Sequence, residues 1–170
     1  LDETTREQVE VVPRDKLRLA FVGVDTPEKG GEAWRAIASG SAAEKLELYH
    51  FGQSEDRLSN VTYVNVDFHD SPTAMTDALM AYNIDAALLW SICPETYSFT
   101  YFECLSAGTF ILSSIHGGNI AARIIADHTG RVFDDQGQLV SALNGSEELI
   151  DEVKRYRASI TSRPLYTMSD

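Results

Sequence analysis

Short apolar runs alternate with amphipathic segments along most of the chain. Six of these runs are rich in branched or aromatic residues, which is typical of buried strands. They predict strands at 17–23, 46–51, 61–66, 84–90, 109–113 and 130–133. The first run, from Leu17 to Gly23, is almost continuously apolar, as expected for a strand of a parallel sheet that is buried on both faces.

Helical periodicity is found between and after these runs. A helix is predicted from about Glu32 to Ser39, and a second one after Ser71-Pro72, with the serine as N-cap and the proline at the first helical position. The last helix is predicted to begin with a capping pair formed by Asn144 and Glu147. Apolar stripes at helical spacing mark three helices. Their members are Met75, Ala78, Leu79 and Tyr82; Ile120, Ile124 and Ile125; and Leu149, Ile150, Val153, Tyr156 and Ile160.

Strands that alternate with helices predict an α/β fold, a Rossmann-like parallel sheet with helices on both faces. At 170 residues, one domain is expected. We assign it residues 17–165, and we assign the polar residues 1–16, which include Pro13, to a linker or interdomain segment. Because the sequence begins at Leu1 rather than at methionine, we expect a fragment of a longer protein.

Charge and composition restrict the possible partners. The net charge of −12 argues against nucleic acid, since phosphate contacts need clustered Lys and Arg. No Lys or Arg lies between Arg57 and Arg123, so a phosphate bound there would depend on backbone N–H groups and helix amino-termini. No apolar stretch approaches the ~20 residues of a membrane span. Cys93 and Cys104 suit a reducing compartment and are expected to be buried. We expect a cytoplasmic protein that reaches the inner face of a membrane only through other domains.

The histidines give no metal site. His50, His69 and His128 are scattered without metal-ligand spacing. His116 stands beside Gly117-Gly118 at a predicted strand end, where it is either catalytic or held by the backbone. No neighbouring serine and aspartate pattern supports a catalytic triad.

Two glutamates form the main candidate site. Glu95 and Glu103 have seven residues between them and lie between the strands predicted at 84–90 and 109–113. Glu95 would follow the carboxyl end of a strand, and Glu103 would lie in the next helix. Ligands of open parallel sheets bind beyond the carboxyl ends of the strands, so this segment is the predicted binding region.

Three segments in order carry a family resemblance: FVGVDTPEKG at 21–30, PETYSFTYFECLSAG at 94–108 and GGNI at 117–120. With these, residues from about Leu17 to Phe133 resemble the C-terminal, donor-binding domain of GT-B glycosyltransferases, specifically retaining family four (glycosyl transferases group 1). The resemblance implies transfer of a hexosyl or deoxyhexosyl group from a nucleoside diphosphate sugar, such as a UDP- or GDP-sugar, to a saccharide or lipid-linked acceptor in polysaccharide biosynthesis, with no cofactor. It also implies an N-terminal acceptor domain that is absent from this chain, so the chain alone is expected to bind donor without turnover.

The resemblance implies roles for individual residues. Glu95, the assigned catalytic position, would hold hydroxyls of the donor sugar, and Glu103 would hold the ribose, because a carboxylate has two acceptor oxygens. Lys29 would contact the diphosphate as a point charge. Backbone groups at the amino-termini of two helices would complete the binding site, those of Tyr97, Ser98, Phe99 and Gly118. The rings of Tyr97 and Phe99 are expected to serve for packing.

The chain also departs from the family pattern. Val24 stands where an arginine usually follows the first glycine, Ser98 replaces a common glycine, and Asn65 replaces another. Loss of the arginine would weaken diphosphate binding by roughly ten- to a hundredfold. Arg57 and Arg123 are the candidates to compensate.

Two other functions stay open. A degenerate domain would bind a nucleotide sugar or glycan without transferring it, which Val24 favours. A GT-B sugar-nucleotide epimerase would be distinguished by its product. A receiver or flavodoxin-like module is disfavoured, because neither paired acidic residues nor a Ser/Thr-rich phosphate loop follows the first strand.

Overall fold

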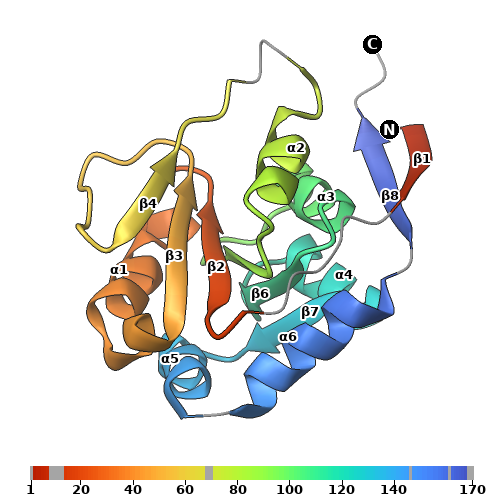
Figure 1. Ribbon diagram of the computed structural model, residues 1–170. Coiled ribbons are helices and arrows are strands. Elements are labelled where there is room, and N and C mark those ends of the chain that lie inside the picture. The colour runs from red at the N-terminus through yellow and green to blue at the C-terminus, as the bar shows by residue number, and fades with distance from the viewer. Residues whose placement is uncertain (1, 8–13, 68–70, 146, 161, 168–170) are drawn as a thin grey trace.

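The computed structural model describes residues 2–7, 14–67, 71–145, 147–160 and 162–167. Its centre is a six-stranded sheet in the order β4-β3-β2-β5-β6-β7 (Figure 1). Every neighbouring pair is parallel. The strands are β2 (Leu17–Val22), β3 (Leu46–Phe51), β4 (Val61–Val64), β5 (Ala86–Leu89), β6 (Phe110–Ser114) and β7 (Gly130–Phe133). The predicted parallel α/β sheet is confirmed.

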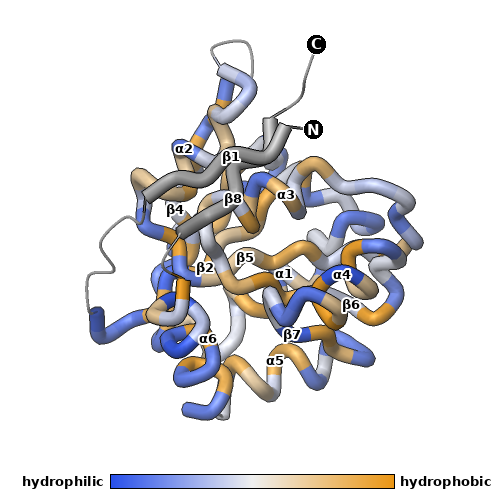
Figure 2. Tube along the Cα trace, turned by 90° about the vertical axis from the view of Figure 1, so that its right-hand side faces the viewer, coloured by the Kyte–Doolittle hydropathy of each residue, from blue (hydrophilic) through white to orange (hydrophobic). Residues whose placement is uncertain are grey.

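Helices cover both faces of the sheet because strand residues alternate between two cores (Figures 1 and 2). On β2, Leu19 and Phe21 belong to one core, whereas Ala20 and Val22 belong to the other. The first core is covered by α1 (Gly31–Ser39), α5 (Gln136–Gly145) and α6 (Glu147–Ser159). The second is covered by α2 (Ala74–Ala81), α3 (Phe99–Ser106) and α4 (Asn119–Asp127). Two short 3-10 helices, η1 (Pro27–Lys29) and η2 (Ser41–Lys45), flank α1.

The predicted start of α2 is wrong by a few residues. The helix begins at Ala74, with Thr73 at its N-cap. The Ser71 hydroxyl instead accepts a hydrogen bond from the amide of Thr73 over 3.1 Å. Serine and proline therefore form a turn before the helix, because a serine side chain can satisfy a nearby amide outside a helix as well as at its end.

Three further expectations about the helices and cysteines are wrong. Asn144 lies within α5, a helix that we did not expect, so it cannot cap α6. Ile125 on α4 is 57% exposed instead of facing the core. Cys104 is buried as predicted, but Cys93 is exposed. Among the described helices, none combines the length and apolar character needed to cross a bilayer.

Segments near the two ends of the chain form a second sheet. Strand β1 (Asp2–Glu7) pairs antiparallel with β8 (Ser162–Thr167), and β8 lies against α3 (Figure 1). Within the expected linker or interdomain segment of residues 1–16, residues 2–7 form a strand, and residues 8–13 lie outside the described part of the chain. The sequence DETTRE has no alternation of apolar and polar residues that would signal a strand. The assignment of 17–165 to one domain stays a prediction.

Candidate functional site

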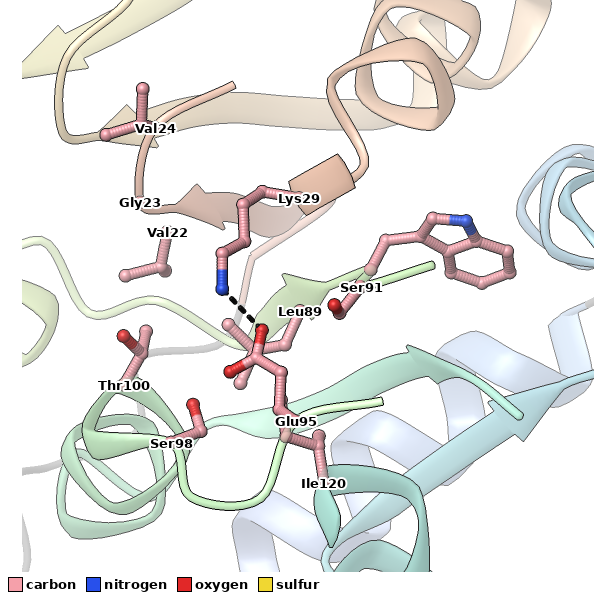
Figure 3. A pocket seen from close by; sticks show the side chains of 11 residues that line it. Val22, Gly23, Val24, Lys29, Leu89, Ser91, Glu95, Ser98, Thr100 and Ile120 are labelled. Atoms are coloured by element: carbon pink, nitrogen blue, oxygen red, sulfur yellow. Dashed lines mark hydrogen bonds and ion pairs between the residues drawn. The ribbon is translucent and has the colours of Figure 1, made fainter. Parts of the chain in front are cut away.

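The candidate site lies at the carboxyl ends of β2 and β5. These strands are neighbours, but β2 is followed along the chain by a strand on one side and β5 by a strand on the other. Such a reversal of strand order separates the two following loops and leaves a crevice between them. A cavity of about 140 Å³ lies there, between the β2–η1 loop, the β5–α3 loop and the first turns of α3 and α4 (Figure 3).

Two predicted residues meet in this cavity. The Lys29 ammonium, at the end of η1, donates to the Glu95 carboxylate over 2.6 Å (Figure 3). The Glu95 side chain is only 18% exposed, whereas that of Lys29 is 54% exposed. A carboxylate that is largely removed from water needs a partner of this kind. The ion pair therefore holds both side chains against the cavity.

The backbone of Glu95 is tied to the turn that precedes α4. Glu95 and Gly118 form a parallel bridge, and the Asn119 amide donates to the carbonyl of Glu95 over 2.9 Å. The Asn119 side chain also donates to the carbonyl of Thr96 over 3.1 Å. Gly118 has φ 63° and ψ −121°, a conformation that is essentially restricted to glycine. A Cβ at Gly118 would lie 2.7 Å from the Glu95 nitrogen.

The structure thus shows what comes close to Gly118. We predicted that this glycine would let the backbone approach a ligand; the group that approaches it is the backbone of Glu95. Gly118 does not line the cavity, although Ile120 in the next helical turn does. A contact between Gly118 and a ligand stays a prediction, but its part in placing Glu95 follows from the geometry.

Helix α3 begins at the cavity wall. Ser98 is its N-cap, and the Ser98 hydroxyl accepts from the amide of Tyr101 over 3.3 Å. Ser98 and Thr100 both line the cavity. The other amides of the first turn have no carbonyl partner within the helix, and the helix dipole favours an anion beside them. The terminus that we predicted for diphosphate binding therefore lies beside Lys29 and Glu95.

Glu103 lies one turn further along α3 and does not line the cavity. It shares a helix face with Thr100, since residues three apart are neighbours on a helix. Burial raises the pKa of the Glu103 carboxyl to about 7. Among the described residues, no hydrogen bond or ion pair partner is found for this carboxylate. The Glu103 carboxylate is half-buried, and its oxygens can still accept hydrogen bonds. Its predicted role, to accept hydrogen bonds from ligand hydroxyls, needs such an acceptor.

The rings of Tyr97 and Phe99 pack on each other at the surface and not in the core. Tyr97 is 43% exposed and Phe99 is 52% exposed. Their ring centroids are 4.9 Å apart, and Tyr97 also stacks on Phe102 at 5.4 Å. Neither ring lines the cavity, and a contact of their backbone groups with a donor stays a prediction.

Positive charge at the cavity is scarce. Of the described residues that line it, Lys29 is the only lysine or arginine, and the exposed Val24 lines it as well. Arg57 and Arg123 each lie over an aromatic ring, at 4.9 and 5.8 Å from its centroid, and neither lines the cavity. Compensation for the missing arginine by either of these side chains stays a prediction.

A buried histidine supports the β2–η1 loop. The Nε2 atom of His50 lies 2.8 Å from the carbonyl oxygen of Gly23. Burial lowers the pKa of His50, so its ring is neutral near pH 7 and donates from Nε2. A Cβ on Gly52 would collide with the same carbonyl of Gly23. These contacts pack the carboxyl ends of β2 and β3 tightly together next to Val24. The spacing of the histidines in the sequence did not reveal this structural role of His50.

Several cavity residues had not been predicted. They come from strand ends and from the first turns of α3 and α4: Val22, Leu89, Trp90, Ser91, Thr100 and Ile120. Ser91 follows β5 almost directly, and its place after a strand is the signal that would have found it. His116 is exposed and lies outside the cavity lining.

The described residues contain no group of three His, Cys, Asp or Glu side chains arranged to hold a metal ion. His69 lies outside these residues. The cavity of about 140 Å³ is close to the roughly 150 Å³ that holds a benzene ring in another protein. It therefore has room for one ring-sized group, and the rest of a longer ligand would lie along the surrounding loops.

No protein-family model matches the sequence, and no curated protein matches it significantly. Solved structures do resemble the fold. WaaG, described as a glycosyltransferase involved in lipopolysaccharide biosynthesis, has a TM-score of 0.59 and 24% identity, over 86% of this chain and 43% of that one. The C-terminal domain of a glycosyl transferase group 1 family protein, LpcC, from Francisella tularensis has a TM-score of 0.59 and 13% identity, over 85% of this chain and 80% of that one. Anabaena Alr3699/HepE, solved with UDP and glucose, has a TM-score of 0.60 and 14% identity, over 85% and 42% of the two chains.

The chain therefore spans less than half of the WaaG and HepE chains that it resembles. At these identities the likeness concerns the fold: an open Rossmann-like sheet that matches the domains of GT-B glycosyltransferases.

The contact between Gly118 and Glu95 gives a test that needs no ligand. Gly118→Ala should destabilise the protein by about 1–3 kcal/mol and release the Glu95 loop, because alanine tolerates neither the backbone conformation nor the close approach. Hydrogen exchange of the Asn119 amide should then rise by roughly tenfold or more, while amides within β5 and β6 change little. Gly145→Ala is the matched control, since a Cβ at Gly145 meets open space. Unchanged protection of Asn119 would contradict the positioning role.

Proposed function

We propose that this chain is the donor-binding part of a glycosyltransferase that moves a hexosyl or deoxyhexosyl group from a nucleoside diphosphate sugar to a saccharide or lipid-linked acceptor, with retention. One observation carries the proposal. Lys29 and Glu95 meet in a cavity at the switch point of the sheet. A cation and a hydroxyl acceptor, placed side by side, match the two unlike ends of a diphosphate–sugar linkage.

Binding would separate this ion pair. Lys29 would turn to the diphosphate, since more than half of its side chain is exposed. Glu95 would then accept hydrogen bonds from two adjacent hydroxyls of the sugar. The first-turn amides of α3 would add donors to the phosphate. Lys29 and these amides would stabilise the charge that develops on the leaving nucleoside diphosphate, while Glu95 orients the sugar.

Glu103 would complete the nucleotide contact by accepting from the ribose hydroxyls. The ring-sized cavity suits the sugar or one phosphate, so the nucleoside would lie outside it. The position of Glu103, three residues after the cavity residue Thr100 on α3, supports this contact. The proposed role involves no metal or other cofactor.

The comparisons support the proposal at the level of fold. HepE, with the same fold, was solved with UDP and glucose, and WaaG is described as acting in lipopolysaccharide biosynthesis. By analogy we propose a role in polysaccharide or glycolipid synthesis on the cytoplasmic side, with the acceptor bound through a further domain. A GT-B sugar-nucleotide epimerase stays an alternative. The reaction product would distinguish it from a glycosyltransferase.

A second candidate function is a domain that binds a nucleotide sugar or glycan without transfer. The observation that favours it is the uncharged Val24 on the cavity wall, which leaves Lys29 as the one lysine or arginine among the described lining residues. A transfer assay separates the two candidate functions. It uses a longer polypeptide that contains this chain and a further domain for the acceptor. With UDP-glucose or GDP-mannose and a saccharide acceptor, the first function predicts a new glycosidic bond with the anomeric configuration of the donor, observed by NMR. Binding without product would favour the second.

Calorimetry should separate the roles of Lys29 and Glu95. Lys29→Gln should weaken binding of both UDP and UDP-glucose by roughly ten- to a hundredfold, because both carry the diphosphate. Glu95→Gln should weaken UDP-glucose by on the order of tenfold but should not weaken UDP, because UDP has no sugar for Glu95 to hold and the variant frees Lys29 from its ion pair. Lys45→Gln is the control, since Lys45 donates to the carbonyl of Asn144 away from the site. An equal loss for both ligands in Glu95→Gln would show that Glu95 does not hold the sugar.

The pH dependence of binding tests Glu103. Its raised pKa of about 7 means that the carboxylate form grows as pH rises from 6 to 8. Hydrogen bonds from ribose hydroxyls favour that form, so UDP-glucose should bind about tenfold more tightly at pH 8 than at pH 6. A nucleotide sugar suits the test because both ends of its diphosphate are esterified and have no proton to lose in this range. In Glu103→Gln the dependence should disappear; a wild-type profile that stays in the variant would assign it to another group.

A further inference from the structure

Three aromatic rings form a cluster at the start of α3. Tyr97 lies between the other two: its ring meets Phe99 edge-on at 4.9 Å and stacks on Phe102 at 5.4 Å. Phe102 is half-buried and packs against the core, and Arg123 lies over its ring at 5.8 Å. We call Tyr97, Phe99 and Phe102 the aromatic platform.

The platform is exposed, although its rings could have been buried. Tyr97 and Phe99 are 43% and 52% exposed. Both precede or begin α3, and the residue between them, Ser98, lines the cavity. The platform therefore lies outside the cavity lining, on the loop and first helical turn that also carry Glu95 and Ser98. Rings held by one another offer contact area at little cost in conformational entropy, as at binding surfaces.

Polar groups surround these apolar rings. Among the described residues, no hydrogen-bond partner is found for the Tyr97 hydroxyl. The Arg123 guanidinium is half exposed, with one ion pair to Asp127 at 3.7 Å. An acyl chain laid on the platform would leave such donors without partners, at a cost. A pyranose ring suits them better, because its C–H face packs on an aromatic ring while its hydroxyls point sideways to polar groups.

We propose that the aromatic platform binds a sugar ring of the acceptor and so makes this chain part of the acceptor site. The inference rests on the proposed function, in which Glu95 holds the donor sugar. Tyr97 is two positions from Glu95 in the same loop, so a saccharide stacked on Tyr97 and Phe99 would be held by the loop that positions the donor sugar, outside the donor cavity. The acceptor class that fits is a saccharide with an accessible apolar pyranose face.

Saturation-transfer NMR with methyl β-glucoside and octyl β-glucoside, the latter below its micelle concentration, tests this proposal. Transfer from the protein to the pyranose C–H protons is expected with both probes. It should fall by roughly three- to tenfold in Tyr97→Ala and in Phe99→Ala. Tyr97→Phe should retain most of it, because the ring remains. Ile125→Ala, at an equally exposed apolar residue of α4, is the control and should change nothing.

The other outcomes are distinct. Transfer to the octyl chain alone would overturn the proposal in favour of a lipid surface, and absence of transfer to either probe would overturn it outright. A pyranose signal that disappears in Glu95→Gln but not in Tyr97→Ala would place the probe in the donor cavity and not on the platform. UDP-glucose binding, measured on the same wild-type sample, separates the two proposals. Nucleotide-sugar binding without a glucoside signal removes the platform alone, whereas a glucoside signal without nucleotide-sugar binding removes the proposed donor site.

Discussion

The parallel bridge between Glu95 and Gly118 is the contact on which the site depends. It joins two loops that follow neighbouring strands, and through the Asn119 amide it fixes the backbone from which the Glu95 carboxylate extends. Lys29 reaches this carboxylate from a third loop. Because the bridge needs a backbone conformation that is essentially restricted to glycine, one residue without a side chain determines where the main functional side chain lies.

The bridge is effective only because the sheet beneath it is fixed. Strand β5 is held at its amino end by Asp85, whose carboxylate accepts from the amide of Arg18 over 2.9 Å. The buried Arg157 donates to the neighbouring Asn83 side chain over 2.7 Å and so holds α6 to the same edge. At the carboxyl end, His50 supports the loop after β2. The amino ends of β2 and β5 are therefore tied to each other, and the loop at the carboxyl end of β2 is tied to β3.

Most of this fold could be predicted, because buried parallel strands are marked by apolar runs whose ends lie within two residues of the observed ones. Helix starts were harder, since Ser71 satisfies a nearby amide outside the helix and Asn144 lies in a helix with a weak apolar stripe. The family resemblance assigned Lys29 and Glu95 to one donor, but no local pattern shows that Gly118 is pressed against Glu95. The exposure of Tyr97 and Phe99 was equally hidden, because apolar rings are expected inside and only the packing of α3 shows which remain outside.

Charge sets the remaining constraint on how this site binds an anion. The chain carries a net charge of −12, and among the described residues lining the cavity one lysine is the only lysine or arginine, itself neutralised by Glu95. A diphosphate that approaches must release Lys29 from Glu95, so the Coulomb energy gained on one side is partly lost on the other. That loss is small only if the ligand also brings hydroxyls that satisfy Glu95. A bare phosphate lacks them, and a diphosphate joined to a sugar has them. The ion pair therefore favours a ligand that carries both groups over one that carries phosphate alone.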